Sequence, residues 1–187
     1  MESTRPCASS ACRTASKWRI NHLLAALFAA FFSTSAVYAQ QPASCASAAH
    51  RAFDFSLGEW QVHGANGKLA GTNAITSAHG GCVLRENYRT PGNYSGESIN
   101  IYDASRKVWH QTWADSSGLL LTLEGGLQDG KMVLEGRVPG TGGSTVKHRI
   151  TWTPNADGSV RQHWESTDSN GKWTTAFDGK YTRKTSP

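Results

Sequence analysis

The sequence predicts an all-β protein that forms an antiparallel up-and-down β-barrel of about ten strands. From Glu59 onward, strand-like segments alternate with short turns rich in Gly, Asn and Asp, and no segment shows a helical period. An aromatic-rich stretch at residues 53–60 precedes them and contains Gly58 and Trp60, where the chain can turn sharply and place an indole at a barrel end. Closure of such a meander into a barrel removes exposed strand edges. A β-sandwich is the alternative that the same pattern permits.

The expected strands are separated by turns that supply the positive φ angles of tight hairpins, such as Asn66-Gly67, Asp129-Gly130 and Asn170-Gly171. Because these connections are short, strands that are neighbours in sequence are expected to pair with each other. The strands are expected over residues 59–64, 68–79, 83–90, 95–103, 108–115, 119–125, 131–138, 145–153, 159–167 and 172–183.

Several runs of the chain carry a family resemblance. Residues 53–60 read Phe-Asp-Phe-Ser-Leu-Gly-Glu-Trp, and the other matching runs are residues 80–86, 96–103, 109–115, 148–154 and 177–181. Over residues 49–184 the chain resembles a family of small secreted bacterial domains of unknown function that begin with Phe-Asp-Phe-x-x-Gly-x-Trp and belong to the lipocalin-like (calycin) barrels. Members of this family mostly lack an assigned activity. The resemblance therefore implies a lipocalin-like fold and export more strongly than it implies any chemistry.

The first 39 residues have the features of a signal peptide. Their basic residues outnumber the single acid, Glu2, and are Arg5, Arg13, Lys17 and Arg19. An apolar run at residues 23–32 follows, and small residues lead to Val37-Tyr38-Ala39, so cleavage is expected after Ala39. A membrane anchor is the alternative, but the run is shorter than the ~20 residues that span a bilayer. We therefore expect a periplasmic or secreted protein with no stable membrane insertion after cleavage.

Loss of this segment would change the charge balance. The chain carries 19 Lys+Arg and 14 Asp+Glu, and without residues 1–39 these numbers fall to 15 and 13, a net charge of +2 in place of +5. The basic character therefore gives little reason to expect nucleic acid or an anionic membrane as a partner. The remainder has the length of one ordinary domain, which we divide into a flexible leader at 40–51 and a lipocalin-like barrel at 52–187.

Cysteine usage agrees with export. Cys7 and Cys12 would leave with the signal peptide, so Cys45 and Cys82 remain as a pair in an oxidising compartment. A disulfide between them is predicted, and closing a loop of this length would stabilise the fold by about 4 kcal/mol in the chain-entropy account. The chain has no Cys-x-x-Cys motif for redox chemistry, and two isolated cysteines make no zinc site.

Two hairpins allow a prediction of register. A four-residue loop at 104–107 places Tyr102 opposite Trp109, Asn100 opposite Gln111 and Ser98 opposite Trp113. A four-residue loop at 155–158 places Arg149 opposite Trp164, Thr151 opposite Gln162 and Thr153 opposite Val160. One face of each hairpin then combines Trp with Asn, Gln or Arg.

This mixed face is expected to line a cavity for a small, partly apolar or lipid-like ligand with an acceptor or acid group for Arg149, because aromatic rings supply contact area and polar groups fix orientation. The expected ligand-binding residues on the two hairpins and on the neighbouring strand are Asn100, Gln111, Trp113, Arg149, Gln162, Trp164, Glu86 and Tyr88. Two alternatives stay open. The barrel is closed and filled by these side chains, or the opposite face, with Ile99, Ile101 and Ile150, is the inward one.

Catalysis is the less favoured function. Glu86 and Asp115 are the best candidates, since a carboxyl group buried beside aromatic rings can act as a general acid or base. Strand carboxylates are more often solvated or paired with Arg. His110, His148 and His163 are expected to point outward, and no histidine spacing suggests a metal or haem site. No Gly-x-Ser-x-Gly motif is present, so neither a cofactor nor a hydrolase triad is predicted.

Overall fold

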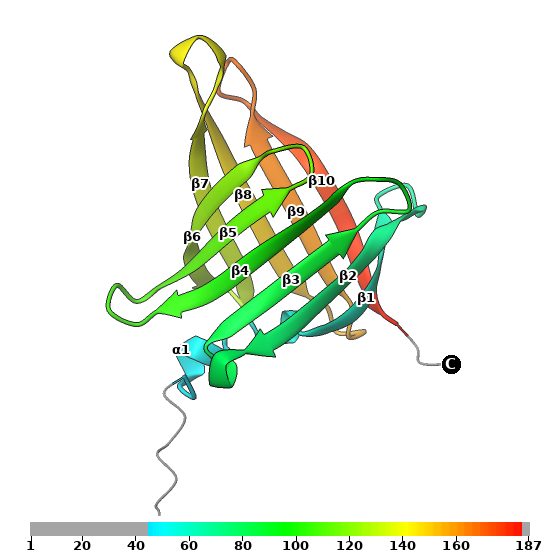
Figure 1. Ribbon diagram of the computed structural model, residues 1–187, viewed down its shortest axis with the longest axis vertical. Coiled ribbons are helices and arrows are strands. Elements are labelled where there is room, and N and C mark those ends of the chain that lie inside the picture. The colour runs from blue at the N-terminus through cyan, green and yellow to red at the C-terminus, as the bar shows by residue number, and fades with distance from the viewer. Residues whose placement is uncertain (1–44, 185–187) are drawn as a thin grey trace, which may run out of the picture. The chain divides into compact units, whose positions relative to one another are not determined.

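The computed structural model describes residues 45–184, which form a closed antiparallel barrel of ten strands (Figure 1). Each strand pairs with its neighbours in sequence, and the first strand pairs with the tenth to close the barrel. The strands are β1 (Gly58–Gly64), β2 (Leu69–Ala78), β3 (Val83–Arg89), β4 (Ser95–Asp103), β5 (Val108–Asp115), β6 (Leu120–Gln128), β7 (Lys131–Pro139), β8 (Thr145–Pro154), β9 (Val160–Thr167) and β10 (Trp173–Arg183). The predicted fold class is therefore confirmed, and the architecture is consistent with a lipocalin-like barrel.

The expected strand bounds agree closely with the observed ones. β4 and β5 begin and end where the sequence predicts, and β6 differs most, because it continues to Gln128. Within residues 45–184, four short helical segments lie outside the strands. They are α1 (Ala48–Arg51), η1 (Asp54–Ser56), η2 (His79–Gly81) and η3 (Thr141–Gly143).

Large aromatic side chains fill the end of the barrel nearest α1. The Phe53 ring lies 5.7 Å from each of the rings of Trp109 and Trp152, and all three side chains are buried. Trp60 is buried beside them and donates its indole N–H to the backbone oxygen of Ser56 at 2.8 Å. The expected role of Trp60 as an indole at a barrel end agrees with this packing.

Gly58 leads the chain into β1 with a φ angle of 139°, a conformation that side chains with a Cβ rarely adopt. A Cβ at this position would also overlap the guanidinium of Arg183, which lies 4.3 Å from the centre of the Trp60 ring. Arg183 further donates to the backbone oxygen of Leu57 at 2.7 Å. Glycine at position 58 therefore leaves room for Arg183, at the end of β10, to reach the Trp60 ring. This contact ties the end of the last strand to the start of the first.

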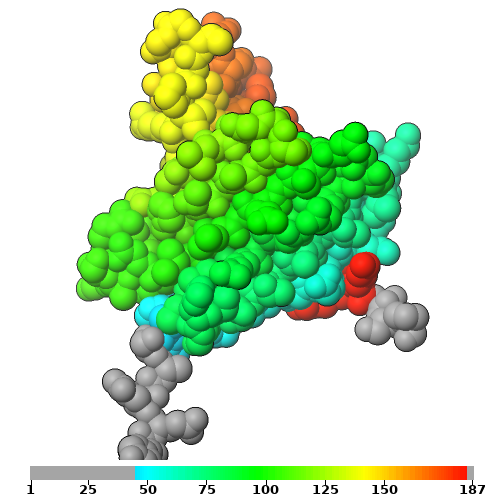
Figure 2. All heavy atoms as spheres, viewed as in Figure 1, coloured from blue at the N-terminus to red at the C-terminus, as the bar shows by residue number. Residues whose placement is uncertain are grey.

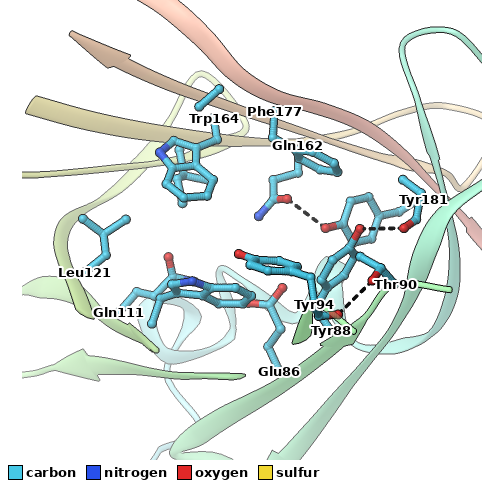
Figure 3. Close-up of a pocket in the computed structure, with 14 residues that line it drawn as sticks. Glu86, Tyr88, Thr90, Tyr94, Gln111, Leu121, Gln162, Trp164, Phe177 and Tyr181 are labelled. Carbon is cyan, nitrogen blue, oxygen red and sulfur yellow. Dashed lines mark hydrogen bonds between the residues drawn. The ribbon is translucent and has the colours of Figure 1, made fainter. Parts of the chain in front are cut away.

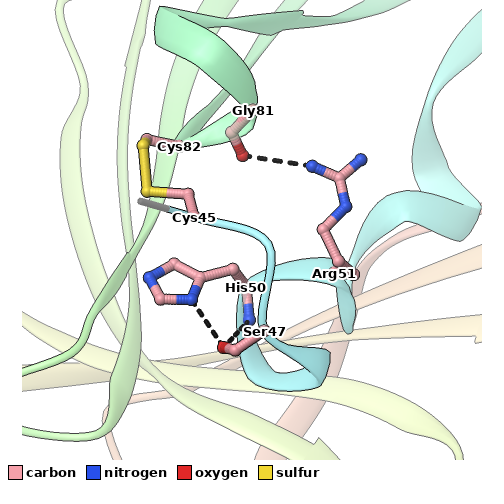
Figure 4. The surroundings of a disulfide bond; sticks show 6 residues. All are labelled: Cys45, Ser47, His50, Arg51, Gly81 and Cys82. Atoms are coloured by element: carbon pink, nitrogen blue, oxygen red, sulfur yellow. Dashed lines mark hydrogen bonds between the residues drawn. A yellow bond between two sulfur atoms is a disulfide. The ribbon is translucent and has the colours of Figure 1, made fainter. Parts of the chain in front are cut away.

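The predicted disulfide between Cys45 and Cys82 is present, with the two Cα atoms 5.0 Å apart (Figure 4). Arg51 reinforces this connection, because it donates to the backbone oxygen of Gly81 at 3.3 Å and pairs with Asp54. The expected flexible leader covers residues 40–51, of which the structure describes 45–51. In this described part, α1 forms and the disulfide holds the chain against the barrel end, so it is a structured cap.

The expected register of the β4–β5 hairpin is confirmed: Tyr102 pairs with Trp109, Asn100 with Gln111 and Ser98 with Trp113. These pairs surround a loop whose length the sequence predicts correctly. Ile99 and Ile101 consequently lie on the outer face, where they are 52% and 36% exposed.

The expected register of the β8–β9 hairpin is wrong by one residue. Asn155 N–H donates to the Ser159 oxygen at 2.8 Å, and Gly158 N–H donates to the Asn155 oxygen at 3.0 Å. With Gly158 at φ 77°, this is the geometry of a three-residue turn with a glycine bulge in place of a four-residue loop. Ile150 therefore faces Trp164, and Trp152 faces Gln162.

This shift reverses the orientation expected for β8. Ile150 is buried inside the barrel, and so is His148, although the sequence predicts that His148 points outward. Arg149, expected inside, lies on the outer face, where its Nε donates to Glu135 at 2.6 Å and its guanidinium lies over the Trp173 ring. A slip of one residue moves every side chain of a strand to the other face. The outward positions of His110 and His163 are confirmed by their contacts with Glu124 and Thr175.

The expected signal peptide at residues 1–39 lies outside the described residues. Within residues 45–184, no helix has the length and apolar character needed to cross a membrane. In the space-filling view, the β7–β8 hairpin, yellow, and the adjoining turn of β9 and β10, orange, extend beyond the ends of the green strands (Figure 2). This end of the barrel is the one opposite the α1 cap (Figure 1).

Candidate functional site

A cavity of about 390 Å³ occupies the half of the barrel away from the α1 cap (Figure 3). Its lining comes from strands around the barrel and from the β3–β4 turn, and several lining residues near the mouth are partly exposed. This volume falls within the range of small-molecule sites. The barrel is therefore packed shut at one end and hollow at the other.

Aromatic rings dominate the lining. They are Tyr88, Tyr94, Trp113, Trp164, Phe177 and Tyr181. The other apolar lining residues are Ala70, Leu121, Ile150 and Ala176. The polar lining residues are Glu86, Thr90, Gln111 and Gln162, so the lining contains no Lys, Arg or His.

Glycines make room for some of these rings, Gly96 from the strand beside Trp113 and Gly179 from the same strand as Phe177. A Cβ at Gly96 would overlap the Trp113 ring, and a Cβ at Gly179 would lie 2.6 Å from Cε1 of Phe177. Since contacts this short are not tolerated, both rings occupy space that any larger residue would take. The positions of two cavity walls thus depend on residues that carry no side chain of their own.

The floor of the cavity is a buried polar network centred on Glu86. Its carboxyl accepts a hydrogen bond from Asn73 Nδ2 at 2.7 Å and another from Ser98 Oγ at 2.6 Å. Asn100 Nδ2 donates to Ser98 Oγ at 2.9 Å, and Gln111 Nε2 donates to Asn100 Oδ1 at 2.8 Å. Short hydrogen bonds therefore connect side chains of β2, β3, β4 and β5.

Burial raises the pKa of Glu86, and the hydrogen bonds from Ser98 and Asn73 only partly oppose this rise. The same burial, with the nearby Glu86 carboxyl, raises the pKa values of Tyr88 and Tyr181. A carboxyl group without a neighbouring cation is costly to ionise in such a place. Glu86 is consequently the group in this cavity best suited to exchange a proton.

The network leaves some polar atoms without a partner. Gln111 Oε1 and Asn73 Oδ1 are buried and accept no hydrogen bond from the described residues. Gln162 Oε1 accepts a hydrogen bond from the Tyr181 hydroxyl at 2.8 Å, while its amide nitrogen points toward the cavity (Figure 3). Unpartnered buried acceptors cost free energy unless a donor reaches them. The floor therefore offers hydrogen-bond capacity that the protein itself does not use.

Two groups at the mouth hold rings of the lining. Asp115 accepts hydrogen bonds from the Tyr94 hydroxyl at 2.9 Å and from the Trp113 indole N–H at 3.1 Å. Burial raises the pKa of Asp115, but hydrogen bonds from Ser117, Trp113 and Tyr94 outweigh it and lower the pKa to about 2. Asp115 is therefore ionised at neutral pH and serves as an anchor for two aromatic rings.

His148 holds the opposite side of the mouth. The Trp164 indole N–H donates to His148 Nδ1 at 3.0 Å, so this nitrogen carries no proton in the hydrogen-bonded state. Burial lowers the pKa of His148, which favours this neutral form. The other ring nitrogen, Nε2, is buried and finds no partner among the described residues.

Most of the residues predicted for the site meet in this cavity. Glu86, Tyr88, Gln111, Trp113, Gln162 and Trp164 line it. Asn100 lies behind the lining, where it is buried and bonded to Gln111. Arg149 lies outside the barrel and does not contribute. That these residues bind a ligand stays a prediction.

Sequence reasoning missed several lining residues. Tyr181 and Phe177 lie on β10, where the alternation Phe177-Asp178-Gly179-Lys180-Tyr181 places the aromatic residues on one face and would have identified them. Tyr94 precedes β4 in a turn, where no periodicity reveals the direction of a side chain. Ile150 falls on the wrong face in the sequence prediction because of the β8–β9 register.

The described residues contain no group of three or more His, Cys, Asp or Glu side chains that could hold a metal ion. In comparisons with known proteins, the chain matches no family model and no curated protein. The cavity itself is therefore the main guide to what the protein does.

Proposed function

We propose that this barrel binds a small, partly apolar molecule in the cavity of its open half. The observation that carries this proposal is the cavity, of about 390 Å³, whose aromatic walls meet the buried Glu86 carboxyl and Gln111 Oε1, an acceptor without a partner among the described residues. Aromatic walls supply apolar contact, and a few convergent polar groups orient a ligand. Three of the aromatic rings are held in place and so do not fill the space. Trp113 packs against the backbone at Gly96, Tyr94 is bonded to Asp115, and Trp164 is bonded to His148.

We also propose that the protein is exported to the periplasm or secreted, and that it belongs to the bacterial family whose members begin with Phe-Asp-Phe-x-x-Gly-x-Trp. The signal-like segment at residues 1–39 supports export. The disulfide between Cys45 and Cys82 agrees with it, since such bonds persist in oxidising compartments.

Tryptophan fluorescence tests the binding proposal. Lipids, aromatic acids, amines, alcohols and haem are titrated into the disulfide-bonded protein, and a saturable change is expected for at least one class. Trp113→Phe should weaken that response, because Trp113 lines the cavity. Trp173→Phe is the matched control, since Trp173 lies outside the barrel under Arg149. If no class gives a saturable change, the closed barrel without a ligand is the better description.

Catalysis by Glu86 is the second candidate function. Its support is the raised pKa of a carboxyl group that lines a ligand-sized cavity. The other polar lining residues are Thr90, Gln111 and Gln162, and none of them forms a nucleophile–base pair with Glu86. Turnover of a bound compound that Glu86→Gln abolishes, while binding persists, would favour an enzyme over a binding protein.

A further inference from the structure

We infer that the cavity takes a small organic cation, an ammonium group on a partly apolar body, with Glu86 as its counter-ion. This inference rests on the proposed function and names the class of ligand. It follows from three features of the same site: the balance of charge, the balance of hydrogen-bond donors and acceptors, and the aromatic walls.

The balance of charge favours a cation. Glu86 is 4% exposed, and none of the described ion pairs includes it. The lining contains no Lys, Arg or His. Arg149, the basic residue that the sequence places inside, lies on the outer face. An ionised carboxylate buried without a cation is unfavourable, so either a proton or a positively charged ligand must neutralise it. An anionic ligand would instead add a second negative charge.

The hydrogen-bond balance points the same way. Glu86 already accepts from Asn73 and Ser98, but Gln111 Oε1 is a buried acceptor on the lining without a donor. Asn73 Oδ1 lacks a donor as well, but Asn73 bonds to Glu86 from behind the lining. A protonated amine carries up to three N–H donors and no acceptor. It therefore complements Glu86 and Gln111, while the Gln162 amide nitrogen, which also points toward the cavity, adds a donor to the lining.

The walls suit the charge and the body of such a ligand. The faces of Trp and Tyr rings attract a cation through their quadrupole, most strongly where water is excluded. Tyr88, Trp113 and Trp164 line the cavity together with Glu86, and Leu121 and Ile150 add aliphatic surface. Because Asp115 and His148 hold the two indoles by hydrogen bonds, the aromatic surface is already arranged before a ligand arrives.

Binding of a cation is expected to depend on pH, since a proton and the ligand compete for the same carboxylate. The titratable groups that face Glu86 are Tyr88 on its own strand and Tyr181 on β10, whereas β2 and β4 present the uncharged Asn73 and Ser98. Both tyrosines stay neutral over the range in which Glu86 titrates, because their pKa values are raised. Affinity should therefore rise with pH until Glu86 is ionised.

Three ligands of similar shape test the inference: 2-phenylethylamine, 2-phenylethanol and phenylacetate. Each is titrated into the full, disulfide-bonded chain at about pH 8 and about pH 5, with calorimetry and tryptophan fluorescence as readouts. At the higher pH the amine should bind about tenfold more tightly than the alcohol, as a charged hydrogen bond and ring contacts are added. Its affinity should fall at the lower pH, whereas that of the alcohol should not.

Glu86→Gln should abolish the preference for the amine, and Glu135→Gln, a carboxylate on the outer face, should retain it. If Glu86→Gln does not fold, the comparison of the two pH values in the natural sequence still decides the matter. Equal or tighter binding of the alcohol or of phenylacetate would overturn the inference and leave the proposed ligand binding intact. If none of the three ligands binds, the inference fails, and the wider screen decides the proposed function separately.

Discussion

The indole of Trp113 occupies the space that a side chain at Gly96 would need. A Cβ at Gly96 would overlap the six-membered ring of Trp113, which forms one wall of the cavity. Gly96 lies on β4, and Trp113 lies on the neighbouring strand β5. The shape of the cavity is thus set partly by a position with no side chain.

Gly96→Ala should displace this wall. The added methyl group must push the indole away, which we expect to cost about 1–3 kcal/mol of stability, as for other overpacked sites. The change should also alter tryptophan fluorescence and weaken ligand binding. Gly126→Ala is the control, because a Cβ at Gly126 meets no atom within 4 Å. Equal effects of the two substitutions on thermal unfolding would contradict this account of the wall.

Loss of the disulfide should destabilise the protein without abolishing the barrel. Cys45→Ser combined with Cys82→Ser is expected to reduce the free energy of unfolding by about 4 kcal/mol in the chain-entropy account. The ten strands pair with one another without help from the segment before β1, so the β-sheet circular-dichroism spectrum should persist. Denaturant unfolding of the variant beside the oxidised natural protein measures the difference. A variant with no folded state would show that barrel closure depends on the disulfide.

Much of the barrel could be predicted because hairpin turns and alternation are local. The β4–β5 loop has a predictable length, so the sequence alone places Asn100 opposite Gln111 correctly. The β8–β9 prediction fails because Gly158 takes a positive φ, which makes a three-residue turn where a four-residue loop is expected. One residue in one turn is enough to exchange Arg149 for Ile150 on the cavity side.

The charge of the cavity could not be predicted for the same reason. With Arg149 inside, the sequence favours an acceptor or acid group on the ligand, whereas with Arg149 outside the lining contains a single carboxyl group and no cation. The unpartnered acceptors depend on side-chain contacts between four strands, which no local pattern in the sequence describes.

Glu86→Gln should change how stability depends on pH. The pKa of Glu86 is raised above its ordinary value of 4.5 in the folded protein, so the folded state holds this proton more tightly than the unfolded state. Its contribution to stability is therefore fully present below about pH 4.5 and is lost as the pH rises through the folded-state pKa. The variant should lack this loss, and Glu135→Gln should keep it. The free energy of unfolding is measured between pH 4 and 8 for both proteins. If it changes with pH in the same way for Glu86→Gln and the natural protein, Glu86 is not a buried ionisable group.

His148 should produce a dependence of the opposite sign. Burial lowers its pKa below the ordinary 6.5, so the unfolded state binds a proton more readily, and stability falls as the pH drops below about 6.5 toward the folded-state pKa. Protonation of Nδ1 would also break the hydrogen bond from Trp164. His148→Gln keeps an acceptor but cannot titrate in this range, so it should remove the loss of stability on the acidic side. His163→Gln, on the outer face, is the control; if both variants behave alike, His148 is not the group responsible.

The most direct test of the cavity as a binding site is to follow the indole N–H signals of the tryptophans by two-dimensional NMR during titration with 2-phenylethylamine. Single Trp→Phe variants assign the signals. Binding in the cavity should give saturable shifts for Trp113 and Trp164, which line it, and leave the signals of Trp60, buried at the closed end, and Trp173, on the outer face, unchanged. Saturable shifts at Trp173 with none at Trp113 and Trp164 would contradict it.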